Sequence, residues 1–276
     1  MSVEQRDDLD QFRSRQSPQG PWRRFLRGFV HFFSYHLILS QKRTRITRAA
    51  GFRLIVPPTV FHPRYFLTSE YFARFIGGLD LAGKCVADVG TGSGILAMAA
   101  VRAGAPRAVA IDINPNAAGT AGVNARANGL DGKVSPLVSD LLANVPPGER
   151  FDVIFSSPPS FAGEPRDLAD RAWHAGPDYR DIADLFGQAR ELLAPGGRMY
   201  LLVSTDSDLT LLGRLIREAG FDARLVHERS IWIESFLIYE LTLPAAEGAT
   251  TKPGAADPSN KPSGEEQPVC QAGHGG

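Results

Sequence analysis

Asp88, Gly90, Gly92 and Gly94 lie close together and form a segment that can bind a small molecule. Glycine lets the backbone approach a ligand closely, and the first turn of a following helix offers N–H groups without partners. The dinucleotide fingerprint needs a glycine at its sixth position, where this chain has Ile95, and the Gly-Lys-Ser/Thr of a phosphate-binding P-loop is missing. The spacing therefore argues against NAD and against a P-loop.

Polar residues also follow the next three predicted strands. Asp112 ends the second strand, Asp140 follows the third, and Ser157-Pro158-Pro159 follows the fourth. Open α/β sheets bind ligands at the carboxyl ends of their strands, so these residues are expected to gather at one edge. A carboxylate there can accept two hydroxyl donors at once.

The elements that must position these residues alternate between strand and helix from Lys84 onward. Strands are predicted at 84–89, 107–112, 133–138, 151–156, 198–204, 222–229 and 235–243, and helices at 93–103, 115–128, 180–193 and 208–219. Such alternation predicts a parallel sheet with helices on both faces. The last two strands have no helix between them, which predicts an antiparallel last strand. The fold class is therefore α/β, a doubly wound, mostly parallel seven-stranded sheet.

The segment from Asp88 to Gly94 resembles motif I of the class I S-adenosylmethionine-dependent methyltransferases. The resemblance implies a Rossmann-like methyltransferase fold, with S-adenosyl-L-methionine as cofactor. It also implies that Asp112 accepts hydrogen bonds from the ribose hydroxyls and that Asp140 binds the adenine amino group. The implied cofactor-binding set is Thr68, Asp88, Gly90, Thr91, Gly92, Gly94, Asp112, Ile113, Asp140, Leu141 and Ser157.

The tetrapeptide Ser157-Pro158-Pro159-Ser160 resembles the Asp/Asn/Ser-Pro-Pro-aromatic motif of amino-group methyltransferases. In that family the polar side chain and the first proline carbonyl accept hydrogen bonds from the target nitrogen. Such acceptors orient the N–H groups so that the nitrogen lone pair faces the methyl group. The resemblance implies catalytic roles for Ser157, Pro158 and Pro159.

Three further stretches resemble the release-factor glutamine methyltransferases and their relatives. They are Val60-Phe61-His62-Pro63 with Thr68, the pair Asn124 and Asn128, and Arg171–Asp178. The glutamine enzymes carry Asn where this chain has Ser157, and Tyr where it has Ser160. A serine hydroxyl can still hold an N–H, but the surface for stacking a planar amide must come from elsewhere. The residues expected to bind the acceptor are Phe61, Ser160, Phe161 and Trp173.

The formal net charge is zero, yet the charge is unevenly distributed. Residues 11–69 hold eleven Lys and Arg side chains and no Asp or Glu, while the whole chain has 30 of each sign. This basic arm, 11–69, suggests an anionic partner such as RNA, a ribosomal surface or an anionic membrane. The alternative is that the arm lies against the acidic body of its own chain.

The expected organisation has four parts. Residues 1–20 read as a flexible lead-in, 21–78 as a basic helix, hairpin and entry helix, 79–244 as the S-adenosylmethionine-binding domain, and 245–276 as a disordered tail. The helix at 22–40 either lies in a membrane surface or covers the core. The hairpin joins 44–48 to 52–56, and Thr68 or Ser69 caps a helix that runs to Ile76.

Several classes of protein are disfavoured. No run of eighteen apolar residues exists, so no transmembrane helix is predicted. Two cysteines are too few for a disulfide framework, which indicates a reducing, cytoplasmic setting, with peripheral membrane association left open. None of the six histidines has metal-ligand spacing, so no metal site is predicted.

The sequence thus predicts an S-adenosylmethionine-dependent methyltransferase. Its acceptor is an amide or amine nitrogen on a protein, of the glutamine type, or on RNA. One alternative is a methyltransferase that acts on a small molecule or lipid at a membrane surface. Another is a non-catalytic binding module of the same fold, because fold alone never proves activity.

Overall fold

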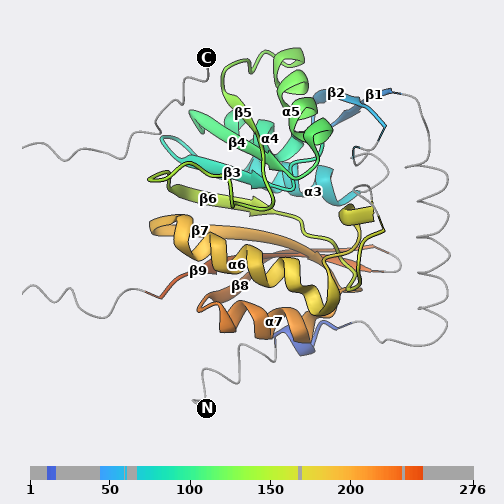
Figure 1. Cartoon of the computed structure of the whole chain (residues 1–276), viewed down its shortest axis with the longest axis vertical. Helices are drawn as coiled ribbons and strands as arrows, with labels where there is room; N and C mark the ends of the chain where they lie inside the picture. Colours follow the sequence, from blue (N-terminus) through green and yellow to red (C-terminus); the bar gives the residue numbers. More distant parts are fainter. Residues whose placement is uncertain are drawn as a thin grey trace, which may run out of the picture.

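A seven-stranded sheet forms the centre of the molecule (Figure 1). The computed structural model describes residues 11–16, 44–58, 60, 67–166, 170–231 and 234–244. The strand order is β5-β4-β3-β6-β7-β9-β8. The strands are β3 (Cys85–Val89), β4 (Arg107–Asp112), β5 (Val134–Val138), β6 (Phe151–Ser156), β7 (Leu193–Ser204), β8 (Asp222–Ser230) and β9 (Ser235–Thr242).

The pairing directions confirm the predicted fold class. Strands β5, β4, β3, β6 and β7 pair in parallel, and β9 runs antiparallel to both of its neighbours, β7 and β8. Strand β7 begins at Leu193 instead of at the predicted residue 198. The added residues include Pro195 and two glycines, which in the sequence indicate a turn and not a strand. They belong to β7 because Leu193 pairs with Phe151 in β6, with a shift of register between Phe151 and Val153.

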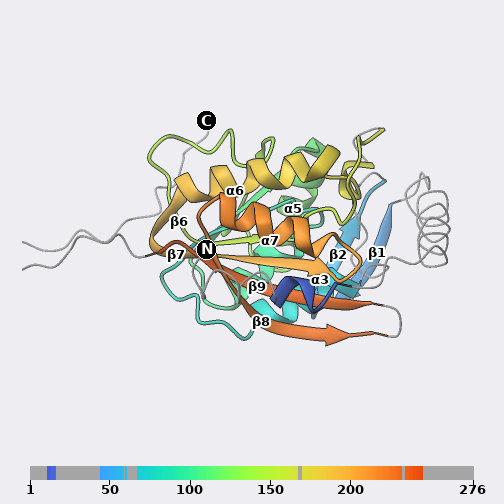
Figure 2. The same cartoon turned by 90° about the horizontal axis from the view of Figure 1, so that it is seen from below.

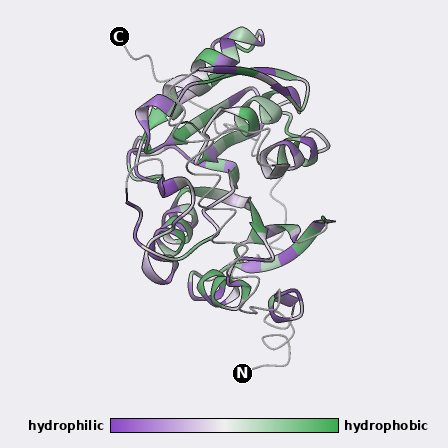
Figure 3. Cartoon of the chain, turned by 90° about the vertical axis from the view of Figure 1, so that its right-hand side faces the viewer, coloured by the Kyte–Doolittle hydropathy of each residue, from purple (hydrophilic) through white to green (hydrophobic). Residues whose placement is uncertain are grey.

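Helices cover both faces of the sheet (Figure 2). They are α3 (Leu67–Ile76), α4 (Ile95–Arg102), α5 (Pro115–Ala127), α6 (Arg180–Leu192) and α7 (Leu209–Glu218). Apolar side chains of α3, α4 and α5 pack on one face, and those of α6 and α7 pack on the other. Figure 3 shows the apolar residues of the strands enclosed between these layers. This sandwich is the two-sided arrangement that the alternating sequence predicts.

Local sequence explains where the helices begin. Asn114 caps α5 by accepting a hydrogen bond from the Asn116 N–H at 3.0 Å, and Pro115 occupies the first turn. Asp208 caps α7 through the Leu211 N–H at 2.9 Å. The expected cap at Thr68 is displaced, because α3 already begins at Leu67 and Thr68 lies inside its first turn.

Residues 11–16 are attached to the body of the protein, although they fall within the predicted flexible lead-in. The Phe12 ring is buried and stacks on Tyr239 with 4.5 Å between ring centroids. The ring also fills the space above Gly213, where an added Cβ would come within 2.6 Å of it. The Gln16 side chain donates to the Ser207 carbonyl and accepts from the Leu209 N–H. This anchor depends on a site some 200 residues away in sequence, which local patterns do not reveal.

The predicted hairpin is confirmed as β1 (Arg45–Ala49) and β2 (Phe52–Val56). Ala50 and Gly51 both have positive φ, 47° and 78°, as a two-residue hairpin turn of type I′ requires. The Ala50 N–H donates to Glu70 in α3, and the Ala50 carbonyl accepts from Arg102 in α4. The expected helix at 22–40, the acceptor residue Phe61 and the tail 245–276 lie outside the described residues.

Cys85 opens β3 and is buried. Among the described residues, no helix has both the length and the apolar character needed to span a bilayer.

Candidate functional site

The glycine loop connects β3 to α4, and hydrogen bonds to Asp88 of β3 hold it in place. One Asp88 carboxylate oxygen, Oδ2, accepts from the Thr91 hydroxyl at 2.6 Å and from the Ala97 N–H at 3.0 Å. Gly90 and Gly94 have φ of 76° and 81°, values that disfavour any residue with a Cβ. Asp88 thus holds the loop and the first turn of α4 together.

The glycines of this loop have different tasks. A Cβ at Gly94 would lie 2.7 Å from both the Cα and the Cβ of Ala121, so Gly94 allows α5 to cross the start of α4 closely. A Cβ at Gly90 would meet nothing within 4 Å. The chain therefore leaves open space next to Gly90, where a ligand can approach the backbone.

Asp88 is a buried carboxyl group with an unpaired oxygen. Its Oδ1 has no hydrogen-bond partner among the described residues, and the side chain is fully buried. Burial raises the pKa of Asp88 to about 7, although the hydrogen bonds from Thr91 and Ala97 act in the opposite direction. An ionisable group of this kind beneath a ligand loop is typical of a functional site.

Asp112 lies at the end of β4 and faces the same loop. Its Oδ2 accepts from the Gly92 N–H and its Oδ1 from the Asn114 N–H, both at 2.9 Å. Burial raises the pKa of Asp112 above its usual range. Each carboxylate oxygen has a second lone pair, so the group can still accept two hydroxyl donors. Ile113, the next residue, is half-buried beside it.

Asp140 and Leu141 follow β5 at the same edge of the sheet. The Asp140 carboxylate is exposed and lies 3.9 Å from the Arg171 guanidinium, which comes from the segment after β6. Leu141 has a φ of 51°, a left-handed conformation that is strained for a side chain of this type. The structure thus brings Asp140, which follows β5, close to Arg171 in the segment after β6. The sequence does not reveal this contact.

The serine–proline loop leaves the end of β6 next to the glycine loop. The Ser156 hydroxyl donates to the Val89 carbonyl at 3.1 Å, which joins the ends of β6 and β3. Ser157 is exposed directly after this contact, and Pro158, Pro159 and Ser160 are half-buried. The glycine loop is predicted to hold the methyl donor and the serine–proline loop the methyl acceptor. These two loops therefore begin at the ends of adjacent strands, β3 and β6.

Phe161 and Trp173 lie together beyond this loop. The Phe161 N–H donates to the Trp173 carbonyl at 3.1 Å, and the Phe161 carbonyl accepts from the Ala175 N–H at 2.9 Å. The Phe161 ring lies 6.2 Å from the His174 ring, measured between centroids. Aromatic surface is thus available in the segment that carries Ser160, although Ser160 itself has none.

A buried carboxylate, Asp170, closes this segment. It accepts from the Arg166 backbone N–H at 3.0 Å and lies 3.3 Å from the His174 ring nitrogen Nδ1. Burial opposes the charged form, but the hydrogen bonds from the Arg166 backbone and side chain, together with the nearby charges of His174 and Arg166, hold the pKa of Asp170 below its usual range. These contacts give residues 160–176 a folded shape without regular secondary structure.

Two further residues near this edge are not among the predicted site residues. Tyr179, at the end of a short 3-10 helix (Pro177–Tyr179), is buried and donates to the Ser160 carbonyl at 2.8 Å. Glu234 precedes β9 and accepts from the Ser204 hydroxyl at the carboxyl end of β7. Burial raises the pKa of Glu234, and the charge of Asp206 acts in the same direction. No local sequence signal identifies Tyr179, whereas Glu234 lies between the last two predicted strands.

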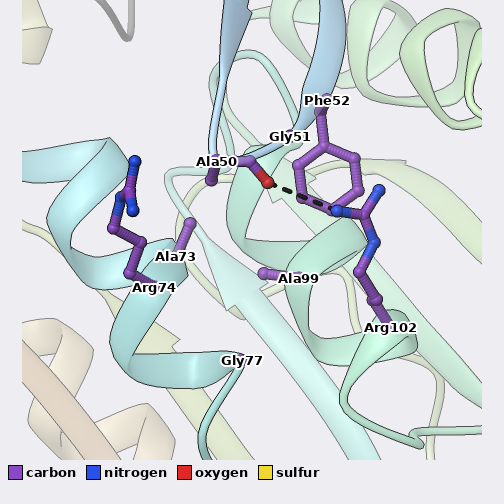
Figure 4. Close-up of a pocket in the computed structure, with 8 residues that line it drawn as sticks. All are labelled: Ala50, Gly51, Phe52, Ala73, Arg74, Gly77, Ala99 and Arg102. Atoms are coloured by element: carbon purple, nitrogen blue, oxygen red, sulfur yellow. Dashed lines mark hydrogen bonds between the residues drawn. The ribbon is translucent and has the colours of Figure 1, made fainter.

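A hollow of about 210 Å³ lies elsewhere, between the hairpin turn, α3 and the end of α4 (Figure 4). Its lining residues are Ala50, Gly51, Phe52, Ala73, Arg74, Gly77, Ala99 and Arg102. Arg102 sits at the C-terminal end of α4, whereas the glycine loop precedes the N-terminal end. Arg74 pairs with Glu70, and Arg102 lies over the Phe52 ring. The hollow is therefore separate from the candidate site.

Within the ranges that the structure describes, no group of three or more His, Cys, Asp and Glu side chains is placed to hold a metal ion. The strand order, the antiparallel β9 and the glycine loop after β3 together define a Rossmann-like methyltransferase fold.

Comparison with known proteins agrees with this class. Residues 68–157 match the family of ribosomal protein L11 methyltransferases (PrmA). A protein of Methanocaldococcus jannaschii, named as an unproven protein N5-glutamine methyltransferase, is 30% identical over 198 residues, which cover 70% of this chain and 96% of that protein. The ribosomal protein L11 methyltransferase of Deinococcus radiodurans is 30% identical over 196 residues, which cover 70% of this chain and 64% of that protein.

A solved structure shares the fold. The T. thermophilus 16S rRNA N2 G1207 methyltransferase, in complex with AdoMet and guanosine, superposes with a TM-score of 0.51 at 23% identity, covering 72% of this chain and 50% of that chain. The chain belongs to the class I S-adenosylmethionine-dependent methyltransferases, whose cofactor is S-adenosylmethionine. It spans less than two thirds of the length of the Deinococcus relative.

Proposed function

We propose that this protein transfers a methyl group from S-adenosylmethionine to an amide or amine nitrogen on a protein. The observation that carries the proposal is the hydrogen bond from Ser156 to the Val89 carbonyl at 3.1 Å. It fixes the start of the serine–proline loop beside the glycine loop. A methyl donor above the glycine loop and a nitrogen held by Ser157 would then face each other.

The chain's own residues suit the cofactor. The open space next to Gly90 admits a ligand close to the backbone, and Asp112 retains one free lone pair on each oxygen for the ribose hydroxyls. Asp140 and Leu141 would border the adenine, and Thr68 would approach from the first turn of α3. The unpaired Oδ1 of buried Asp88 offers a negative charge beneath a cofactor that carries positive charge.

The bound cofactor would supply an electrophilic methyl carbon on a sulfonium. The Ser157 hydroxyl and the Pro158 carbonyl would accept hydrogen bonds from the acceptor N–H groups and so turn the nitrogen lone pair toward that carbon. Orientation of this kind contributes much of the rate in a bimolecular transfer. The new N–C bond forms as the C–S bond breaks, and the extra nitrogen proton leaves to solvent or to a nearby carboxylate such as Glu234.

A protein acceptor is supported by the names of the relatives. The matched family and the Deinococcus and Methanocaldococcus proteins are named for protein acceptors. Phe161 and Trp173 lie in the segment that carries Ser160 and can supply the surface for a planar amide that Ser160 lacks. The proposed acceptor is therefore a side-chain amide or amine in an exposed protein segment.

The proposal is tested in two steps. Calorimetric titration should show binding of S-adenosylmethionine and none of NAD. Methyl-tritiated S-adenosylmethionine is then incubated with ribosomal protein L11 and with a glutamine-containing peptide, and labelled products are located by mass spectrometry. Label on nitrogen of either acceptor supports the proposal. Cofactor binding without transfer to any protein in a cell extract would overturn it and favour a non-protein acceptor.

The variant Ser157→Ala tests the role of the serine–proline loop separately from cofactor binding. It should keep the affinity for S-adenosylmethionine within about twofold and lower the transfer rate about tenfold, which is the cost of one hydrogen bond that orients the nitrogen. A variant with full transfer rate would show that Ser157 does not position the acceptor.

A further inference from the structure

The exposed side of the hairpin is unusual in its composition. Its side chains are Ile46, Arg48, Arg53 and Ile55, here called the hairpin face. Both arginines are exposed, and Ile46 is 63% exposed. The opposite side of the hairpin is buried against the core through Thr47, Ala49, Phe52, Leu54 and Val56. The hairpin is thus firmly seated on the body while it presents this face to solvent.

Arg48 and Arg53 are directly opposite each other across the two strands. The backbone N–H and carbonyl of Arg53 bond to the Asn128 side chain, at 2.9 and 2.8 Å, instead of to β1. The two arginines therefore form a pair without ladder hydrogen bonds, in which the Cα atoms are only about 4.5 Å apart. Like charges at such positions destabilise a sheet.

No ion pair among the described residues offsets this repulsion, because neither Arg48 nor Arg53 is paired with a carboxylate there. Residues 11–69 contain no acidic side chain, and the first one that follows, Glu70, is engaged with Arg74 and the Ala50 N–H. A repulsive pair that the fold does not neutralise is suited to an anionic partner.

The hairpin face is also fixed relative to the glycine loop. Asn124 in α5 donates to the Ile55 carbonyl at 3.0 Å and accepts from the Ile55 N–H at 2.7 Å. The same amide donates to the Ser93 carbonyl of the glycine loop at 2.9 Å. One buried side chain thus joins β2 to the candidate cofactor site. A partner held by the hairpin would therefore be held next to that site.

We propose that the hairpin face binds the phosphate backbone of RNA, so that the protein acceptor of the proposed function is presented within a ribonucleoprotein. The basic residues of both hairpin strands are all arginines, whose planar fork matches phosphate oxygens in a bidentate manner. The two isoleucines can contact sugars beside the phosphates. Binding to a membrane surface needs a wider apolar face than two side chains provide.

The test measures RNA binding without cofactor or acceptor, so its outcome is independent of the proposed methyl transfer. The probe is a fluorescein-labelled 20-nucleotide RNA stem-loop, followed by anisotropy between 50 and 200 mM salt. The full-length wild-type chain is compared with Arg48→Glu. The matched control is Arg214→Glu, which makes the same charge change at an exposed arginine of α7, on the other face of the sheet.

Arg48→Glu should weaken RNA binding about tenfold, and Arg48→Ala should reduce the slope of log affinity against log salt by about one. Arg214→Glu should stay within about twofold of wild type. The Arg48→Glu substitution places a carboxylate opposite Arg53, so the melting temperature of this variant should not fall; measuring it separates a loss of RNA binding from misfolding.

Three outcomes overturn the proposal. Equal losses in Arg48→Glu and Arg214→Glu would mean that only overall charge matters. Unchanged RNA binding in Arg48→Glu would remove the hairpin face from the interaction. Loss of binding to phosphatidylserine vesicles, with RNA binding unaffected, would assign the face to a membrane surface.

Discussion

The Tyr179 hydroxyl donates a hydrogen bond to the Ser160 carbonyl at 2.8 Å and so connects the serine–proline loop to the rest of the fold. The same oxygen accepts from the Asp208 N–H at 3.0 Å, where α7 begins. Tyr179 and the residue before it, Asp178, both have left-handed backbone conformations, with φ of 57° and 50°. Strain at two consecutive residues persists only where the surroundings enforce it, and it is common near functional sites.

Tyr179→Phe removes this hydroxyl and leaves the ring in place. Transfer to the acceptor should slow about tenfold while the affinity for S-adenosylmethionine stays unchanged, because the loop loses its fixed position and the glycine loop does not. Hydrogen exchange measured by mass spectrometry should quicken for the Phe161 and Gly163 amides, which pair with Trp173 and Gly176.

Tyr239→Phe is the matched control for this experiment. The Tyr239 hydroxyl is buried without a hydrogen-bond partner among the described residues, and burial raises its pKa. Removal of an unpaired buried hydroxyl is neutral or stabilising. Equal effects of the two substitutions on loop exchange would contradict a specific role for Tyr179.

Two glycines of one loop should respond differently to the same substitution. Gly94→Ala places a Cβ 2.7 Å from Ala121 and should destabilise the fold by about 2–4 kcal/mol, the combined cost of overpacking and a left-handed backbone. Gly90→Ala meets no neighbour and should cost only about 1–2 kcal/mol. Because its methyl group enters the open space, it should nonetheless weaken S-adenosylmethionine binding. Chemical denaturation and calorimetry measure the two effects, and equal stability losses would contradict the packing role of Gly94.

Much of the candidate site at the carboxyl ends of the parallel strands can be predicted from sequence, because it depends on local sequence patterns. Strand bounds at Arg107–Asp112 and Phe151–Ser156 match the predicted ones, since apolar runs between turn signals specify them. The parallel order then places Asp112 and Ser157 at one edge without further information. Their roles toward cofactor and acceptor stay predictions.

The missed features depend on contacts between distant segments or on unusual backbone. Phe12 has no local signal for burial, because its site is built by Gly213 and Tyr239. Tyr179 adopts a conformation that a tyrosine seldom takes, so its sequence context gives no indication of it. The contact between Arg171 and Asp140 requires the folded path of the segment after β6.

Asp112→Ala should weaken S-adenosylmethionine binding about a hundredfold, because two hydrogen bonds from ribose hydroxyls to a charged acceptor would be lost. The substitution also frees the Gly92 and Asn114 N–H groups, so some loss comes from the loop itself. Asp112→Asn separates the two effects, since the amide oxygen can still accept from Gly92. Calorimetry on both variants should rank the affinities wild type, Asn, Ala. Unchanged affinity in Asp112→Ala would place the ribose elsewhere.

We expect the raised pKa of Asp88 to make the stability of the fold depend on pH below neutrality. In the folded protein the group titrates at about 7, whereas an unfolded aspartate titrates near 3.8. The folded state therefore holds a proton that the unfolded state has lost, so stability falls as pH rises from about 4 to 7. Asp88→Asn should remove this fall and be more stable than wild type above pH 7. Its amide oxygen can still accept from Thr91 and Ala97.

Binding of the cationic cofactor should favour the charged form of Asp88. The affinity of the wild-type protein for S-adenosylmethionine should then rise between pH 6 and 8, with proton release at pH 6.5 detected by calorimetry in two buffers of different ionisation enthalpy. In Asp88→Asn both the rise and the proton release should disappear. If the variant kept the full pH dependence, the responsible group would be another one, and Asp112, whose pKa burial also raises, would be the next to test.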